Sequence, residues 1–238
     1  MKIKKVLAGI LLVLLVPAAV FGIYVSDSYR ADEAALEALM SDDAVRVERR
    51  DYGYLFDGPS KDRALVFYPG AKVQAEAYAP LLHLLAGEGM DVCLAEVPFG
   101  LAILDTDAAS GIMEEEAYED WYVGGHSLGG AMAAWYASDH GDSLKGLVLL
   151  AAYPTRDLED SLTEVLVYGS EDLVVNREKI EEGEDYAPDH LVLHVIEGGN
   201  HAGFGSYGDQ KGDGRALIPA AAQREETVRA ILEGIEGD

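Results

Sequence analysis

Cysteine and basic residues are scarce in this sequence. Cys93 is the only cysteine among 238 residues, so an intrachain disulfide and a cysteine-based zinc site are both excluded. It lies in the mostly apolar run 92–97, which predicts a buried structural thiol. Lysine and arginine number 18 against 43 aspartates and glutamates, for a formal net charge of −25. A chain this acidic repels phosphate backbones and anionic lipid, which argues against nucleic acid as a partner.

One stretch near the N-terminus lacks charge altogether. Residues 6–25 are twenty uncharged residues, and a helix of that length spans about 30 Å, the thickness of the hydrocarbon core of a bilayer. Three lysines precede the run, and charged residues resume at Asp27. The sequence therefore predicts a signal anchor at residues 1–25. It would be a single-pass helix in the cell membrane, with the rest of the chain on the extracytoplasmic side.

The alternative for this stretch is a signal peptide that is cleaved, which would release a secreted protein. The apolar core of a signal peptide is usually about 7–15 residues long and ends at a small-residue cleavage site. Here the run is longer, and its end is crowded by the bulky residues Phe21, Ile23 and Tyr24. These features favour the uncleaved anchor.

The remainder is predicted to be a linker helix at residues 26–44 followed by one α/β domain at residues 45–238. Apolar runs of strand length alternate with helical patterns. Strands are expected at 63–68, 91–97, 121–124, 146–151, 162–168 and 191–196, with two shorter ones within 45–56. Helices are expected at 76–87, 128–138, 178–182 and 219–235. Because the inner strands are apolar throughout, the pattern predicts a mostly parallel sheet flanked by helices on both faces.

The segment Gly125-His126-Ser127-Leu128-Gly129 fits the pattern G-x-S-x-G. A predicted strand ends just before it and a predicted helix begins just after it, as a nucleophile elbow requires. Glycines suit such a tight turn, where backbones approach closely. We therefore expect Ser127 to be a catalytic nucleophile. The alternative is that Ser127 caps the following helix and the glycines serve packing alone.

A serine hydroxyl needs a base to take its proton. His201 follows the last predicted strand in the glycine-rich segment Gly198-Gly199-Asn200-His201-Ala202-Gly203, which suits a loop that positions one imidazole. The alternative for His201 is an ordinary surface loop residue. The other five histidines fit less well, because they fall in the elbow or in and beside helices and strands: His83, His126, His140, His190 and His194.

The third group must orient the imidazole and stabilise its cation. Asp172 follows the predicted strand 162–168 and is the first choice, with the adjacent Glu171 as the rival. The order Ser127, Asp172, His201 is the order found in α/β hydrolases, and it differs from the orders of the chymotrypsin and subtilisin types.

The tetrahedral intermediate of such a reaction needs two N–H donors. The residue after the nucleophile, Leu128, is one candidate. Ala71, in the loop Pro69-Gly70-Ala71-Lys72 after the strand 63–68, is the other. The alternative reading of that loop is an ordinary turn. The candidate substrate-pocket residues are Lys72, Phe99, Phe204 and Tyr207. A calcium site at Asp209 and Asp213 would have too few ligands, so neither a metal nor a cofactor is expected.

Taken together, these residues resemble the α/β-hydrolase superfamily over residues 45–238. The stretches 66–73 and 198–214 look like a compact bacterial branch that is distantly similar to dienelactone hydrolases. Those enzymes carry a cysteine at the elbow, where this chain has Ser127. The resemblance therefore implies a serine esterase that forms an acyl-enzyme.

Only about ten residues separate the predicted strands 147–150 and 162–168, the place where many relatives carry a lid. We expect little or no lid and a shallow, open pocket. The predicted function is hydrolysis of a small-molecule carboxylic ester or thioester with a small acyl group. The alternatives are another activity of the same triad (lipase, peptidase or acyltransferase) or a catalytically silent, membrane-tethered binding module.

Overall fold

The computed structural model describes residues 15–16, 21–22, 27–59 and 62–237. The signal anchor predicted at residues 1–25 therefore lies almost entirely outside the described residues. Within the described ranges, no helix is both long enough and apolar enough to cross a membrane.

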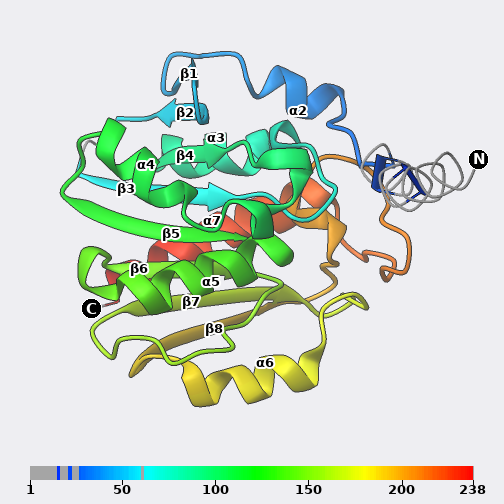
Figure 1. The fold of residues 1–238 in the computed structure, drawn as a ribbon. Coiled ribbons are helices and arrows are strands. Elements are labelled where there is room, and N and C mark those ends of the chain that lie inside the picture. Colours follow the sequence, from blue (N-terminus) through cyan, green and yellow to red (C-terminus); the bar gives the residue numbers. More distant parts are fainter. Residues whose placement is uncertain (1–14, 17–20, 23–26, 60–61, 238) are drawn as a thin grey trace, which may run out of the picture.

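The described residues form one eight-stranded sheet (Figure 1), with strand order β1-β2-β4-β3-β5-β6-β7-β8. Strand β2 pairs antiparallel with β1 and β4, and all other neighbours are parallel, which confirms the predicted mostly parallel sheet. The strands are β1 (Arg46–Arg50), β2 (Gly53–Asp57), β3 (Arg63–Tyr68), β4 (Asp91–Ala95), β5 (Asp120–His126), β6 (Gly146–Leu150), β7 (Thr163–Gly169) and β8 (His190–Ile196).

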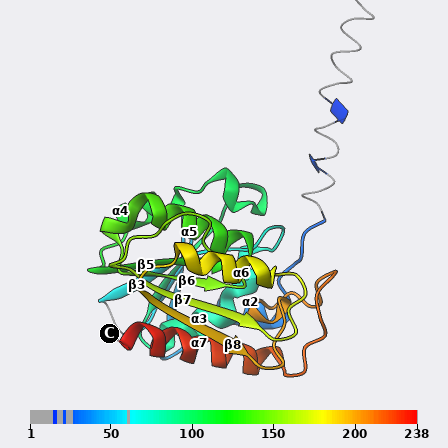
Figure 2. The same cartoon turned by 90° about the horizontal axis from the view of Figure 1, so that it is seen from below.

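Helices cover both faces of the sheet (Figure 2). They are α2 (Glu33–Glu37), α3 (Ala79–Gly87), α4 (Ala108–Glu115), α5 (Leu128–His140), α6 (Arg177–Gly183) and α7 (Ala220–Glu236). Helices α3 and α7 pack on one face, and α4, α5 and α6 pack on the other. Successive residues of one strand enter opposite cores: Val165 and Val167 join the first, whereas Leu166 joins the second. This is why the inner strands are apolar at every position.

The linker predicted to be helical over residues 26–44 contains, in its described residues 27–44, only the short helix α2. Asp32 caps this helix by accepting a hydrogen bond from the N–H of Ala35 at 3.0 Å. Before it, Tyr29 forms a parallel β-bridge with Val73, in the loop that follows β3. Ahead of Asp32 the backbone therefore pairs with the loop after β3 and does not form a helix. This pairing places the start of the described domain at the edge of the sheet where the parallel strands end (Figure 1).

Glu164 is a carboxylate in the interior of the sheet. It is fully buried on β7, between Leu147 of β6 and Leu191 of β8. Within the described part of the chain, neither carboxylate oxygen has a hydrogen-bond partner. Burial disfavours the charged form and raises the pKa of Glu164 to about 8.

This side chain makes the stability of the domain depend on pH. Between the ordinary value of 4.5 and about 8, the folded state holds a proton that the unfolded state has lost. The free energy of unfolding therefore falls as the pH rises through that window, by at most about 1.4 kcal/mol per pH unit. We expect Glu164→Gln to remove this slope. The measurement is the urea midpoint of both proteins at about pH 5 and about pH 8.5. An equal loss of stability in the two proteins would contradict the assignment.

Candidate active site

Ser127 stands at the sharp junction between β5 and α5. Its backbone is left-handed, with φ 53° and ψ −122°, a conformation that is strained for a residue with a side chain. Its N–H donates to the carbonyl of Leu150 at 2.9 Å, which fixes the turn to β6. The hydroxyl makes no capping hydrogen bond to α5, so the helix-cap alternative has no support here.

The glycines around Ser127 are required by close backbone approach. A Cβ at Gly125 would lie 2.5 Å from the carbonyl oxygen of Tyr68, and a Cβ at Gly129 would lie 2.2 Å from the same atom. Both distances are far below contact distance. The first turn of α5 thus sits directly against the end of β3, which the G-x-S-x-G pattern permits.

His201 and Asp172 form a buried pair, each about 1% exposed. His201 Nδ1 lies 2.8 Å from Asp172 Oδ2. The other oxygen of Asp172 accepts the N–H groups of Val174 and Val175, both at 2.8 Å, so the carboxylate is held on both sides. Glu171 instead accepts a hydrogen bond from the Ser170 hydroxyl. Of the two candidate acids, Asp172 is therefore the one that contacts the imidazole.

The pairing leaves one nitrogen of His201 available. Because Nδ1 donates its proton to the carboxylate, Nε2 of the neutral ring carries the lone pair. Nε2 is buried and has no hydrogen-bond partner within the described ranges. His201 and Ser127 line the same cavity, of about 410 Å³. The arrangement can accept a proton inside a cavity that also contains the serine.

The wall of this cavity comes from α5 and from the loops after β6 and β7. Trp135 Nε1 donates to Thr155 Oγ1 at 2.9 Å, and the guanidinium of Arg156 lies 4.3 Å from the centre of the Trp135 ring. Residues 151–162, between β6 and β7, contain no helix, in agreement with the expected absence of a large lid there. The lining residues are Ser127, Leu128, Ala131, Met132, Trp135, Ala151, Ala152, Tyr153, Thr155, Val174, Val175, Asn176 and His201.

The loop after β3 is tied to the elbow through Tyr78. The N–H of Gly70 donates to Tyr78 Oη at 3.0 Å, and Tyr78 Oη lies 2.8 Å from His126 Nδ1. Burial lowers the pKa of His126 well below its usual value, and repulsion from a protonated His201 would lower it further, so the ring is neutral and Nδ1 accepts. The His126 and His201 rings lie 4.4 Å apart. The Tyr78 hydroxyl thus connects the loop after β3 to the elbow, and the His126 ring in turn packs against that of His201.

Two N–H groups near these residues have no acceptor among the described residues. One belongs to Ala71, next to the anchored Gly70, and the other to Leu128, the first residue of α5. The first N–H groups of a helix have no acceptor within the helix. These are the two donors that the sequence proposes for an oxyanion.

The four predicted pocket residues do not line the cavity of Ser127. Lys72 and Phe99 line a separate groove of about 530 Å³, and Lys72 Nζ pairs with Asp27 at 2.9 Å. Phe204 is fully buried, and its ring centre lies 5.5 Å from that of His126. Tyr207 is buried against Tyr29. The two aromatics of the glycine-rich loop thus turn inward to pack.

Sequence reasoning missed the wall residues Met132 and Trp135 and the anchor Tyr78. Helical spacing could have identified Met132 and Trp135. Leu128 and Met132, like Ala131 and Trp135, are four residues apart and so lie on one face of the helix after the elbow. Tyr78 had no such signal, since its contact with His126 joins residues 48 positions apart.

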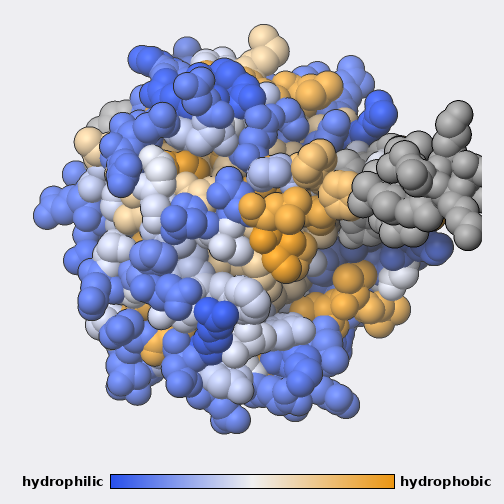
Figure 3. Space-filling model, in the orientation of Figure 1, coloured by the Kyte–Doolittle hydropathy of each residue, from blue (hydrophilic) through white to orange (hydrophobic). Residues whose placement is uncertain are grey.

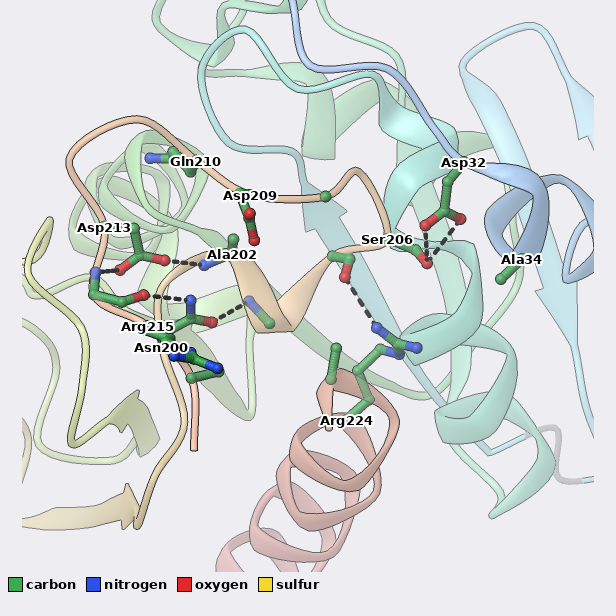
Figure 4. A pocket seen from close by; sticks show the side chains of 16 residues that line it. Asp32, Ala34, Asn200, Ala202, Ser206, Asp209, Gln210, Asp213, Arg215 and Arg224 are labelled. Atoms are coloured by element: carbon green, nitrogen blue, oxygen red, sulfur yellow. Dashed lines mark hydrogen bonds between the residues drawn. The ribbon is translucent and has the colours of Figure 1, made fainter. Parts of the chain in front are cut away.

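Hydrogen bonds between its own residues stabilise the glycine-rich loop after β8 (Figure 4). Asp213 accepts the N–H groups of His201 and Ala202, at 3.2 and 2.8 Å, and Asn200 donates to the carbonyl of Gly214 at 2.8 Å. Beside it, Arg224 donates to the carbonyl of Gly205 at 3.0 Å. Both Asp213 oxygens therefore hold backbone N–H groups. The described residues contain no cluster of three side chains that could hold a metal ion.

Similar structures share this architecture at low sequence identity. Est1E from Butyrivibrio proteoclasticus is 14% identical, with 81% of this chain and 99% of that one covered and a TM-score of 0.55. The esterase Est2 from Thermogutta terrifontis is 19% identical, with 80% and 91% covered and a TM-score of 0.53. A bacterial membrane phospholipase A, a virulence factor, is 12% identical, with 99% and 100% covered and a TM-score of 0.58. At these identities the likeness concerns the fold.

No curated protein sequence matches the chain. The family model described as "Alpha/beta hydrolase family" matches residues 64–225, more than half of the chain, and spans β3 to α7 with the elbow and the Asp172–His201 pair. The chain therefore belongs to the alpha/beta hydrolase family.

Proposed function

We propose that this protein is a serine hydrolase that cleaves a carboxylic ester or thioester with a small acyl group, through an acyl-enzyme on Ser127. One observation carries the proposal. His201 is paired through Nδ1 with buried Asp172. Its Nε2, which has no partner among the residues that the structure describes, belongs to the same cavity as a serine in a strained, left-handed turn. That is the arrangement needed to activate a hydroxyl group.

The reaction follows from these positions. Ser127 Oγ attacks the carbonyl carbon while its proton moves to His201 Nε2, and Asp172 stabilises the imidazolium. The N–H groups of Ala71 and Leu128 bind the oxyanion. When the intermediate collapses, His201 returns the proton to the departing alcohol or thiol. Water then attacks the acyl group in the same way, giving the carboxylic acid and free Ser127.

The cavity favours small acyl groups. Its volume of about 410 Å³ lies toward the lower end of the usual range for ligand sites, about 300–1,000 Å³. The side chains of Leu128, Met132 and Trp135 give it an apolar wall. The similar structure from Thermogutta terrifontis is named as an esterase, which accords with ester hydrolysis here.

The proposal also assigns the domain to the membrane. Residues 1–25 act as a single-pass signal anchor, on the strength of the charge-free run 6–25 and the lysines before it. The domain then lies on the extracytoplasmic side. Extraction of membranes with alkaline carbonate should leave the full chain in the pellet. Release of the chain, or a mature N-terminus near residue 26, would favour the cleaved signal peptide.

Substitution of the triad tests the chemistry. Ser127→Ala and His201→Ala should each lower kcat roughly 10⁴- to 10⁶-fold on p-nitrophenyl acetate and a panel of short-chain esters, because each removes a group that acts in the transition state. Ser143→Ala and His140→Ala, outside the cavity, are matched controls that should leave kcat unchanged. Circular dichroism checks that all variants fold. A folded Ser127→Ala variant with most of its activity would refute the mechanism.

Tyr78→Phe tests whether the Tyr78 hydroxyl positions the loop after β3, which carries the proposed oxyanion donor Ala71. The change removes the acceptor of the Gly70 N–H and the donor to His126, and the free energy of one hydrogen bond is about 1 kcal/mol. We expect kcat to fall about 5- to 10-fold with KM nearly unchanged, because an oxyanion forms only in the transition state. Tyr118→Phe, which removes a hydroxyl bonded to Asp91, is the control. A rise in KM alone would show that Tyr78 acts on substrate binding.

A further inference from the structure

Large apolar side chains are exposed at the edge of the sheet where the site lies. Five of them are each more than half exposed, and we call this set the apolar rim: Phe99, Ile103, Leu104, Leu173 and Leu217. Single exposed apolar residues are ordinary, but a group around one edge marks an interaction surface. In Figure 3, hydrophobic side chains gather on the side where the described domain begins.

The apolar rim surrounds the catalytic edge. Its members follow β4, β7 and β8, whereas Ser127 follows β5, which lies between β4 and β7 in the sheet. Four strand spacings separate β4 from β7, a distance of about 19 Å. A flat apolar surface that touches both sides of the rim would therefore cover the mouth of the Ser127 cavity.

The chain enters the domain at this same edge and is fastened there. The N–H of Tyr29 donates to the carbonyl of Lys72 at 2.7 Å, and the N–H of Gln74 donates to the carbonyl of Tyr29 at 3.0 Å. Asp27 pairs with Lys72. Further on, the Ser206 hydroxyl donates to Asp32 at 2.9 Å. The segment 27–32 is thus part of the domain surface and cannot serve as a long tether.

The predicted span ends very close to this attachment point. The charge-free run ends at Val25, four residues before Tyr29, and four extended residues reach at most about 14 Å. The ring of Phe21, within the predicted span, lies 5.3 Å from the ring of Phe99, a member of the apolar rim. An anchored domain therefore has to hold its catalytic edge at the bilayer.

We propose that the apolar rim lies on the lipid bilayer, so that the cavity of Ser127 opens onto the membrane surface and takes amphiphilic esters from it. The inference rests on the proposed anchor and ester hydrolysis. Without the three lysines of residues 1–25, the chain carries 15 basic and 43 acidic residues. Electrostatic attraction to anionic lipid is thus absent, and the contact is hydrophobic. A zwitterionic surface is the best partner.

Site-directed fluorescence on the full chain tests the docking. The one native cysteine, Cys93, is buried, so an introduced cysteine is the accessible thiol. Ile103→Cys, Leu173→Cys and Leu217→Cys each place a nitrobenzoxadiazole label on the rim. Ser143→Cys places it on an exposed residue at the opposite edge of the sheet. In phosphatidylcholine vesicles, we expect a spin-labelled lipid to quench the rim labels by more than half and to leave the Ser143 label unchanged.

The possible results distinguish failure of the docking from failure of the proposed anchor or of the proposed ester hydrolysis. Rim labels quenched only by aqueous iodide, in protein that resists alkaline extraction, would overturn the docking and leave the anchor intact. Release by alkali would overturn both. Hydrolysis of a water-soluble acetate ester reports on the triad independently of either result.

A second measurement tests delivery of substrate from the membrane. The double variant Ile103→Ser/Leu217→Ser should lower the turnover of the acetate ester of a long-chain alcohol, dissolved in the vesicles, at least about fivefold. Turnover of the water-soluble acetate should be unchanged. Equal turnover of the vesicle-borne ester by the variant and the unaltered protein would contradict the inference.

Discussion

The left-handed backbone of Ser127 is held in place by close packing, and the geometry of the site depends on it. The strained turn is bonded to the carbonyl of Leu150, and the neighbouring glycines let α5 press against the end of β3. Strain of this kind persists only where the surroundings fix it. The result is a serine exposed at the edge of the sheet. The helix N–H directly after it, that of Leu128, has no acceptor in the described part of the chain.

The other groups reach this point because parallel strands end at one edge of the sheet. The loop after β3 brings Gly70 and Ala71, the loop after β7 brings Asp172, and the loop after β8 brings His201. Helix α7 secures the last of these loops: Gln223 accepts from the N–H of Asn200 and donates to its carbonyl. Backbone hydrogen bonds thus fix the position of each of these groups, which is the preorganisation that the proposed mechanism needs.

Local signals in the sequence were sufficient for the strands, the elbow and the pairing of Asp172 with His201, because apolar runs and chain order determine which loops meet. The packing of the glycine-rich loop and the structure of the linker depend instead on contacts between residues far apart in the sequence. Phe204 and Tyr207 looked like pocket residues in a glycine-rich loop, yet both turn inward to pack against His126 and Tyr29. The linker has the composition of a helix, but pairing of Tyr29 with Val73 leaves only α2 helical.

We propose that Ser127, His201 and Asp172 act as one unit. Labelling with a fluorophosphonate provides the test, since the reagent reacts with activated serines and requires no knowledge of the substrate. The adduct on the intact, folded chain is located by mass spectrometry of its peptides. We expect one adduct, on Ser127, that is lost in His201→Ala. A folded protein that forms no adduct, or one that labels equally well without His201, would contradict it.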